Sequence, residues 1–477
     1  MSELPAGWAR AALGDLADFT NGKAFKKEEW LEAGKPIIRI QNLNNPEASF
    51  NYADDSHDEK YLVRNGDLLV SWSASLGVYY WAGQDAWLNQ HIFRVHSLRG
   101  CDKGFLKYAL QVSIDDFYAK AHGMGMVHIT KGNFESHQIA LPPIGEQTRI
   151  AQKLDELLAQ IDTLKARIDA IPALLKRFRQ SVLAAAVSGR LTEDWRSSGA
   201  SIDNGHVLHH QIKEAHAAEG GHARGNASDP TEEAHDLSPD DLPKTWDIAE
   251  LRDICVPGRP ITYGILKPGP ELDEGIPYIR VADFPGNKLN MANIKKTSPE
   301  IDEQFRRARL MEGDLLLSIR GSVGRLIKIP ANLDGANITQ DTARLSISPL
   351  VSTEFVYWAL LADSTQRRMK NATRGVAVRG INIGDVRALQ IPLPPRDEQT
   401  EIVRRVEQLF AFADQLEAKV ATAQARIDRL APSILAKAFR GELVPQDPND
   451  EPASLLLERI QAQRAAAPKA KRGRKSA

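Results

Sequence analysis

Five basic side chains stand between positions 367 and 379, with no acidic residue among them. The segment reads RRMKNATRGVAVRG and carries Arg367, Arg368, Lys370, Arg374 and Arg379. Guanidinium and ammonium groups bind phosphate oxygens, and arginine also pairs with the major-groove edge of guanine through two hydrogen bonds. The segment therefore predicts a contact with nucleic acid, although a solvated surface is the ordinary alternative for any single lysine or arginine.

Residues of related chemistry stand in short polar segments of both halves of the chain. Asparagine and glutamine pair with adenine as arginine pairs with guanine. The predicted DNA-contacting residues of the first half are Lys23, Lys26, Lys27, Arg39, Gln41, Asn42, Ser71, Trp72, Ser73, Asn89, Gln90, His91, Lys120, His122, His128 and Lys131. Those of the second half are the five above together with Lys267, Arg280, Ser318, Arg320 and Gln340. Matched segments such as SWSAS at 71–75 and SIRGS at 318–322 differ, so the two halves are expected to read different bases.

The sequence contains no recognisable motif for bond-making chemistry. It has neither a G-x-x-x-x-G-K-[ST] phosphate loop nor a strand followed by G-x-G-x-x-G. Asp54, Asp55, Asp58 and Lys60 have the residue types of a metal-dependent nuclease, but they crowd into one polar loop that the second half does not repeat. The histidines between 206 and 235 lack partners at metal-ligand spacing. We expect a non-catalytic chain with no metal site and no cofactor of its own.

A tandem duplication organises these segments. LPPIGEQTRI at 141–150 returns as LPPRDEQTEI at 393–402, an offset of 252 (393 minus 141). LPAGW at 4–8 returns as LPKTW at 242–246, an offset of 238 (242 minus 4), and GDLLVSWSASLG at 66–77 returns as GDLLLSIRGSVG at 313–324. The offset drifts through the first part of each copy and is constant afterwards, which indicates variable loops followed by a rigid element.

The rigid element is predicted to be a long helix in each copy. Apolar residues alternate at spacings of four and three, which is the pattern of a coiled coil. Pro-Pro precedes each run and Gly189 or Gly441 follows it, while Pro172 and Pro432 inside the runs are expected to bend or interrupt the helices. One such stripe would ordinarily pack on its own domain, but two of equal length favour helices that pair with each other. The predicted pairing positions are Ile150, Leu154, Leu157, Ile161, Leu164, Ile168, Ile402, Val406, Leu409, Leu416, Val420 and Ile427.

The first part of each copy mixes short apolar runs with one helix, predicted at 105–120 and 355–370, as in an α+β domain. A pseudo-two-fold relation between the copies makes the long helices antiparallel. The expected fold class is α+β, with two repeated α+β domains separated by two long antiparallel coiled-coil helices. The predicted division is a first domain at 1–145, a spacer helix at 146–190, a polar His-rich linker at 191–240, a second domain at 241–397, a spacer helix at 398–441 and a C-terminal segment with a basic tail at 442–477.

Composition sets the class of protein. The 477 residues are 42% apolar and 26% charged, with a net charge of −1, so any nucleic-acid surface must come from local clustering. Cys101 and Cys255 stand in unrelated contexts, which predicts reduced thiols. The apolar runs are too short for a membrane span and the N-terminus lacks a secretory pattern, so a cytoplasmic protein is expected.

In its paired motifs the chain resembles the specificity subunits of type I restriction-modification systems. The resemblance rests on LPP(I/R)xEQ, on the GDLL strands and on the helix ends SVLAAAVSGRL at 181–191 and SILAKAFRGEL at 433–443, and it covers nearly the whole length. It implies a non-catalytic subunit whose two target-recognition domains each read one half-site of a bipartite double-stranded DNA site. The long linker and the basic tail depart from the family pattern.

The resemblance also implies the partners. These are two modification subunits, which bind S-adenosylmethionine and methylate adenine, and restriction subunits, which use ATP and Mg²⁺. The helices would then act as spacer and docking surface. Two other classes remain open: a stand-alone sequence-specific DNA-binding adaptor or regulator, and a purely structural coiled-coil scaffold. A neighbouring methyltransferase gene would favour the specificity subunit over both of these classes, and absence of salt-sensitive DNA binding would favour the scaffold.

Overall fold

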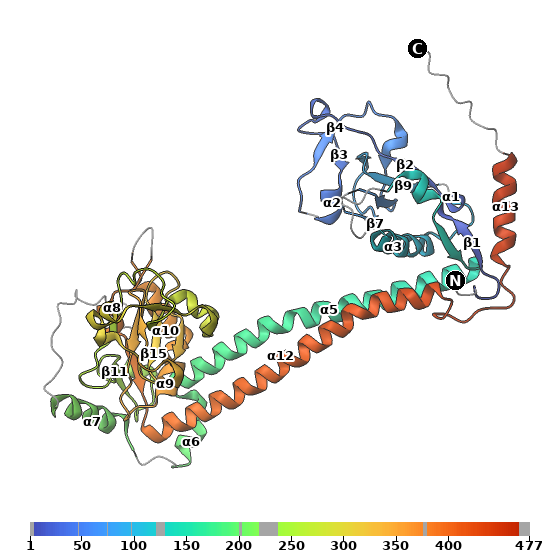
Figure 1. Cartoon of the computed structure of the whole chain (residues 1–477). Helices are drawn as coiled ribbons and strands as arrows, with labels where there is room; N and C mark the ends of the chain where they lie inside the picture. Colours follow the sequence, from blue (N-terminus) through green and yellow to red (C-terminus); the bar gives the residue numbers. More distant parts are fainter. Residues whose placement is uncertain are drawn as a thin grey trace. The chain divides into compact units, whose positions relative to one another are not determined.

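A computed structural model describes residues 4–45, 47–73, 75–96, 98–120, 129–199, 203–218, 237–374 and 379–466. The chain divides into two compact units (Figure 1). The first comprises Met1–Asp169 with Thr422–Ala477, and the second comprises Ala170–Ala421. Each unit contains one α+β domain and part of each long helix, which confirms the predicted fold class.

The domain of the first unit contains two four-stranded sheets and one two-stranded sheet. The strand β6 lies in the middle of the first sheet, and all of its residues are buried. Leu68 and Val70 face the core around the helix α3, while Leu69 faces the other sheet, as the two-residue period of a strand requires. The sheets are β2 (Asp18–Asn21), β9 (Ile92–His96), β6 (Leu68–Ser71), β7 (Gly77–Tyr80); β4 (Asn51–Ala53), β3 (Lys35–Ile38), β8 (Ala86–Leu88), β5 (Leu62–Val63); and β1 (Ala9–Ala12), β10 (Gln138–Leu141), with α3 at Lys103–Lys120.

The domain of the second unit repeats this plan. Leu315 and Leu317 face one core and Leu316 faces another, matching the alternation in β6. The predicted helix at 355–370 is wrong in one respect, because the backbone of Ala362 is extended and divides it into α9 (Thr353–Leu361) and α10 (Asp363–Asn371). The sheets are β12 (Thr262–Tyr263), β18 (Thr342–Leu345), β15 (Leu315–Ser318), β16 (Leu326–Lys328); β14 (Lys295–Thr297), β13 (Ile276–Ile279), β17 (Asn337–Ile338); and β11 (Asp247–Glu250), β19 (Gln390–Leu393).

The spacer helices are α5 (Ile144–Val187) and α12 (Arg396–Phe439), each of 44 residues. Pro172 and Pro432 lie inside them and interrupt neither. Ion pairs and hydrogen bonds fix the antiparallel direction within each unit. In the first unit Lys165 binds Asp428 at 2.9 Å and Asp169 binds Gln424 at 2.5 Å. In the second unit Arg179 Nη2 lies 2.6 Å from Asp414 and 2.8 Å from Glu417.

The predicted pairing positions have three different surroundings. Ile150 and Leu154 are buried in the core of the first domain, and Ile402 and Val406 in that of the second, so the first turns of each helix pack on their own domain. Leu164 is wrong as a pairing position because it is 46% exposed. Two helices bury only one face each, which leaves part of an apolar stripe in solvent. The remaining positions are at least partly buried: Leu157, Ile161, Ile168, Leu409, Leu416, Val420 and Ile427.

The segment 191–240, predicted to be a polar linker, contributes to a core in its middle. The helix α7 (Gly205–Ala218) buries Leu208 and Ile212 in the core of the second domain. Leu208 and Ile212 are four residues apart, so they lie on one face of the helix. Polar residues surround this narrow apolar stripe in the sequence, which makes it hard to recognise. The same segment holds α6 (Glu193–Ser197).

Both cysteines are buried and free, and burial raises the pKa of each thiol, that of Cys255 to about 12. No helix in the described part of the chain is long and apolar enough to cross a membrane. Within the same residues, no three His, Cys, Asp or Glu side chains are grouped to hold a metal ion. His222 and His235 lie outside the described residues.

Candidate nucleic-acid interface

The repeated LPPxxEQ motif joins each domain to its spacer helix. In the first unit the Trp8 indole donates to Glu146 Oε2 at 3.0 Å. Gln147 accepts from the backbone N–H of Asp102 at 2.9 Å and donates to the carbonyl of Pro142 at 2.9 Å. Glu146 and Gln147 are buried, so the motif positions the domain and does not itself face a ligand.

The second unit repeats every one of these bonds. Trp246 donates to Glu398 at 2.8 Å, Ser352 N–H donates to Gln399 at 2.7 Å, and Gln399 donates to the carbonyl of Pro394 at 2.9 Å. The motif therefore occurs twice because each copy satisfies the buried polar groups of one junction between a domain and its helix. Its two copies hold equivalent parts of two equivalent domains.

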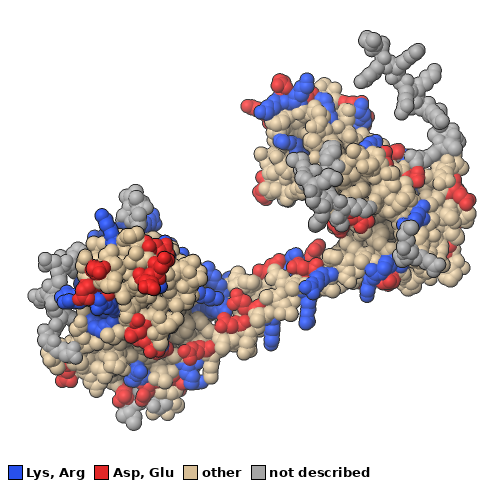
Figure 2. All heavy atoms as spheres, viewed as in Figure 1, with Lys and Arg blue, Asp and Glu red and all other residues tan. Residues whose placement is uncertain are grey.

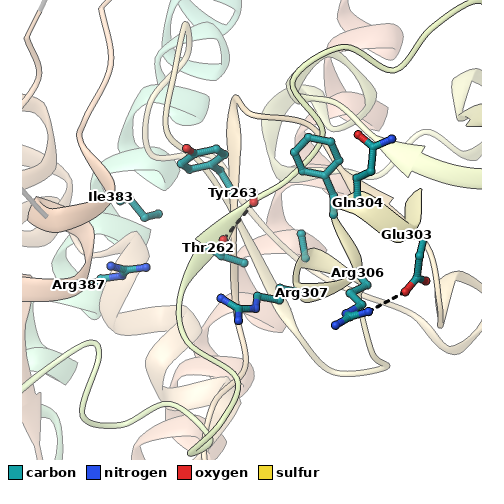
Figure 3. Close-up of a pocket in the computed structure, with 10 residues that line it drawn as sticks. Thr262, Tyr263, Glu303, Gln304, Arg306, Arg307, Ile383 and Arg387 are labelled. Atoms are coloured by element: carbon teal, nitrogen blue, oxygen red, sulfur yellow. Dashed lines mark hydrogen bonds and ion pairs between the residues drawn. The ribbon is translucent and has the colours of Figure 1, made fainter. Parts of the chain in front are cut away.

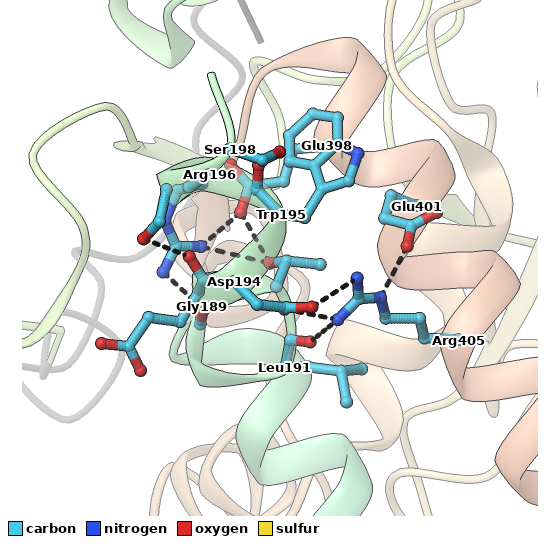
Figure 4. A network of polar contacts seen from close by, with 12 residues as sticks. Gly189, Leu191, Asp194, Trp195, Arg196, Ser198, Glu398, Glu401 and Arg405 are labelled. Atoms are coloured by element: carbon cyan, nitrogen blue, oxygen red, sulfur yellow. Dashed lines mark hydrogen bonds and ion pairs between the residues drawn. The ribbon is translucent and has the colours of Figure 1, made fainter. Parts of the chain in front are cut away.

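The junction of the second unit carries additional charged contacts (Figure 4). Glu398 accepts from the Thr192 hydroxyl at 2.7 Å and forms an ion pair with Arg196. Arg405 binds Asp194 at 2.6 Å, the carbonyl of Leu191 at 2.8 Å, and Glu401 at 2.6 Å. The end of α5 is therefore fixed to the beginning of α12 within this unit.

In the first domain, two loops meet because β3 and β8 run parallel. Ile38 lies opposite Leu88 in this pairing, and the N–H of Asn89 donates to the carbonyl of Ile38 at 3.1 Å. The residues that follow each strand therefore lie together. They line a cavity of about 390 Å³ whose lining residues are Phe25, Trp30, Arg39, Ile40, Gln41, Asn89, Gln90 and His91.

Five of the predicted contact residues thus share one site, and the side chains offer mixed chemistry. The Arg39 guanidinium lies 5.6 Å from the centre of the Trp30 ring, a cation–π contact. Gln41 and Gln90 are exposed, and the Gln90 amide lies 3.2 Å from His91 Nε2. Amide, imidazole and guanidinium groups at a concave surface are suited to base edges and phosphates.

Several predicted contacts of the first domain have structural roles. Asn42 is only 6% exposed and uses its amide to bind Arg39 N–H and the carbonyls of Ala48 and Ser49. Ser71 and Ser73 are buried, and Ser71 donates to the carbonyl of Ser75 at 2.6 Å. These three predictions are wrong because their polar groups are enclosed in the fold.

Five other predicted residues of this domain are at least partly exposed: Lys23, Lys26, Lys27, Trp72 and Lys131. Trp72 stacks on Phe93 with 5.7 Å between ring centres, and Lys23 pairs with Glu29. Lys131 donates to the carbonyl of Phe19 at 2.6 Å. Lys26 and Lys27 are exposed. Only the backbone of Lys120 is described, and His122 and His128 lie outside the described residues.

In the second domain, backbone hydrogen bonds gather the basic loop against the end of β15. Arg374 and Gly380 exchange two bonds of 2.8 and 3.0 Å, and Gly321 N–H donates to the carbonyl of Arg379 at 3.0 Å. Arg320 donates to Gln340 Oε1 at 3.3 Å. Arg320, Gln340, Arg374 and Arg379, hereafter the arginine cluster, are therefore brought together, and its three arginines are exposed.

Two predicted contacts of the second domain, Arg368 and Ser318, are wrong because both residues are buried. Arg368 is 6% exposed and binds the carbonyl of Gln390 at 2.9 Å, so it supports the fold. Arg280 is held by Asp283 through bonds of 2.7 and 3.1 Å. Ser318 is fully buried and donates to the carbonyl of Ser322. Lys267 and Lys370 are exposed, and the exposed Arg367 pairs with Asp363 at 3.1 Å.

A second cavity, of about 530 Å³, lies in the second domain and includes residues that the sequence analysis missed (Figure 3). Arg306, Arg307 and Arg387 line it. The run RRAR at 306–309 was a visible signal, since it places three arginines within four positions. Elsewhere basic and acidic side chains are interspersed on the face shown in Figure 2, in keeping with a net charge of −1.

Comparison with known proteins identifies the family. Residues 5–173 and 243–423 match the family model described as type I restriction modification DNA specificity domain. A chain with two such α+β domains and two spacer helices is a duplicated specificity protein by its fold. It belongs to the type I restriction modification DNA specificity family, which confirms the predicted resemblance.

Individual relatives agree over the full length. The type I restriction enzyme EcoBI specificity subunit of Escherichia coli is 34% identical over 483 residues, covering 98% of this chain and 94% of that protein. The EcoKI specificity subunit of Escherichia coli strain K12 is 30% identical over 518 residues, covering 99% of both.

Solved structures show the same fold. The HsdS subunit from Thermoanaerobacter tengcongensis aligns with a TM-score of 0.52 at 19% identity, over 93% of this chain and 99% of that one. A chain from a solved structure on the complex assembly and conformational transition of the type I R-M system aligns with a TM-score of 0.58 at 18% identity, over 93% of this chain and 100% of that one.

Proposed function

We propose that this chain is the DNA sequence-recognition subunit of a type I restriction-modification complex. It reads a bipartite site in double-stranded DNA, with one half-site for each domain. It makes and breaks no bonds itself, and it docks two modification subunits and the restriction subunits. S-adenosylmethionine, ATP and Mg²⁺ are used by those partner subunits, in the cytoplasm.

The observation that carries this proposal is the contrast between equivalent junctions and divergent loops within one chain. Trp8–Glu146 and Trp246–Glu398 are geometrically equivalent. The exposed loops of the two domains are not, because the first presents amides, an imidazole and one guanidinium, whereas the second presents three guanidiniums and one amide. Equivalent supports with different surface chemistry are what two reading domains with different half-sites require.

The side-chain types support a distinction between the half-sites. Gln41 and Gln90 in the first domain can each accept from and donate to the major-groove edge of adenine. The arginine cluster in the second domain supplies bidentate donors for guanine. We therefore assign adenine-directed contacts to the first domain and guanine-directed contacts to the second.

One experiment tests the proposal against a stand-alone DNA-binding adaptor. The chain is purified from its host with its bound proteins, which are identified by mass spectrometry, and methylated adenines are sequenced in the host with and without the gene. The proposal expects a co-purifying methyltransferase and the loss of one bipartite methylated motif on deletion. An unchanged methylation pattern without a bound methyltransferase would refute it in favour of the adaptor.

A further inference from the structure

The cavity of about 530 Å³ in the second domain is built from three separate segments (Figure 3). One wall is β12, with Thr262 and Tyr263, and another is η9 (Arg306–Ala308) with the residues just before it. The third is α11 (Ile383–Ala388), from which the Arg387 side chain points toward β12 in Figure 3. The site is therefore assembled by the tertiary fold of one domain.

Two of its three arginines retain uncompensated charge. Arg306 pairs with Glu303 at 3.0 Å. Arg307 is exposed, and among the described residues it has no acidic side chain within ion-pair distance. Arg387 donates from Nε and Nη2 to the carbonyl of Ile261 at 3.1 and 2.7 Å, which holds the guanidinium in place without neutralising it.

The electrostatic surroundings of Arg387 agree with this assignment. Burial, and then the charge of Arg252, lower the pKa of Arg387, so its cationic form is not stabilised by a neighbouring anion. An added anion would reduce that penalty. A partly enclosed arginine held only by a neutral carbonyl is thus suited to bind a negatively charged oxygen.

The cavity adjoins the arginine cluster along the chain. Tyr263 precedes Ile265 by two residues, and the carbonyl of Ile265 accepts from Gln340 N–H at 3.0 Å. Ile383 follows Gly380, the partner of Arg374, by three residues. An extended chain advances at most about 3.6 Å per residue, so Ile383, on one cavity wall, lies within roughly 14 Å of the Arg379 backbone. That distance corresponds to about four nucleotide steps of one B-DNA strand.

We infer that this cavity is a phosphate site, which takes a backbone phosphodiester of the DNA next to the half-site read by the second domain. The inference rests on the proposed DNA-recognition function and adds to it a ligand position. Arg307 supplies an exposed contact, and Arg387 supplies one that the carbonyl of Ile261 holds in place. The shared chemistry also fits free inorganic phosphate, and the two sources are separated by experiment.

The test measures how DNA affinity depends on salt, using the full chain in its native complex. Each phosphate neutralised contributes about 0.9 to the slope of log K against log salt concentration. Arg307→Ala is expected to reduce that slope by about 0.9, and Arg307→Lys to retain most of it. Arg396→Ala is the matched control, because it removes the same charge from an exposed position at the start of α12 in the same unit.

The outcomes separate the inference from the function on which it rests. Salt-dependent DNA binding with an unchanged slope in Arg307→Ala overturns the contact with the DNA backbone and leaves the proposed function standing. Absence of DNA binding by the wild-type complex overturns both. Titration with inorganic phosphate, followed by ³¹P nuclear magnetic resonance, gives the second arm. Saturable binding that disappears in Arg307→Ala while the DNA slope stays unchanged would assign the cavity to free phosphate and overturn the backbone contact.

Discussion

The indole nitrogen of Trp8 donates a 3.0 Å hydrogen bond to the carboxylate of Glu146, across 138 positions of sequence. The equivalent pair, Trp246 and Glu398, has further donors in Thr192 and Arg196. The second oxygen of Glu146 is buried and accepts no hydrogen bond within the described residues. The duplicated junction has therefore kept its geometry while its electrostatics have diverged.

This divergence predicts unequal costs for the same substitution. Glu398→Gln removes the charged acceptor of Arg196 and should destabilise the second unit by about 2 kcal/mol. Glu146→Gln should cost the first unit less, because burial raises the pKa of Glu146 and a neutral amide suits that site. Hydrogen exchange with mass spectrometry, followed at β11 and β1, measures each unit separately. Equal protection losses in the two variants would contradict the asymmetry.

A glycine follows each spacer helix and lies close to a proline ring. Gly441 has a φ of +74°, and a Cβ there would lie 2.6 Å from Pro5 Cγ. Gly441→Ala should therefore destabilise the first unit by the cost of a positive φ, about 1 kcal/mol, with a further 1 to 3 kcal/mol from the clash. Gly66→Ala isolates the backbone cost, because Gly66 has a φ of +85° and no atom within 4 Å of its added Cβ. If denaturant unfolding gave the two variants the same stability, the contact with Pro5 would add nothing to the cost of Gly441→Ala.

Acid should weaken the second unit through Glu401. Arg404, and then Arg405, lower the pKa of this carboxyl from 4.5 to about 2 by hydrogen bonding. A carboxyl with a lowered folded-state pKa stabilises the fold above its unfolded-state value, and that contribution is lost as pH falls from 4.5 toward 2. Glu401→Gln should thus be less stable at neutral pH and lose less stability on acidification. Urea unfolding across this interval measures the difference, and parallel pH curves would exclude it.

The arginine cluster should act on one half-site only. Arg320→Ala combined with Arg374→Ala should relax recognition in the half-site read by the second domain, with a cost of about 1 to 3 kcal/mol for each guanine that is no longer bound. Gln41→Ala with Gln90→Ala is the reciprocal variant in the first domain. Binding to a library of duplexes randomised in both half-sites reports each separately. A weakening spread evenly over both half-sites in either variant would argue against independent reading domains.

Spacer length should set the gap between half-sites. Inserting seven residues in both helices, after Asp169 and after Ala421, preserves the heptad register and adds about 10 Å to each. The preferred gap should grow by about three base pairs, with both half-sites unchanged. Altered half-site sequences in the same duplex library would refute this role. A seven-residue insertion in α5 alone should instead disrupt pairs such as Lys165–Asp428.

The repeated motifs predicted the duplication, the apolar spacing predicted both long helices, and the pseudo-two-fold relation between the copies predicted that the helices are antiparallel. All three patterns can be read from a single sequence. They could not distinguish a serine or asparagine that binds a base from one that binds its own loop. Asn42 and Ser71 have side chains suited to base contacts, but these side chains donate hydrogen bonds to backbone carbonyls several residues away. Arg368 likewise donates to the carbonyl of Gln390. The cavity with Arg307 and Arg387 unites three distant segments, which no single motif records.

The first unit is discontinuous, since Met1–Asp169 is completed by Thr422–Ala477. Its core contains Leu435, Ala438 and Ile460 beside residues as early as Trp8. On the ribosome, the second unit has its entire sequence available before the domain that was translated first can finish its core. We therefore expect the first unit to complete its core after the second, and a chain that ends at Ala421 to leave exposed the apolar residues that pack against Leu435, Ala438 and Ile460.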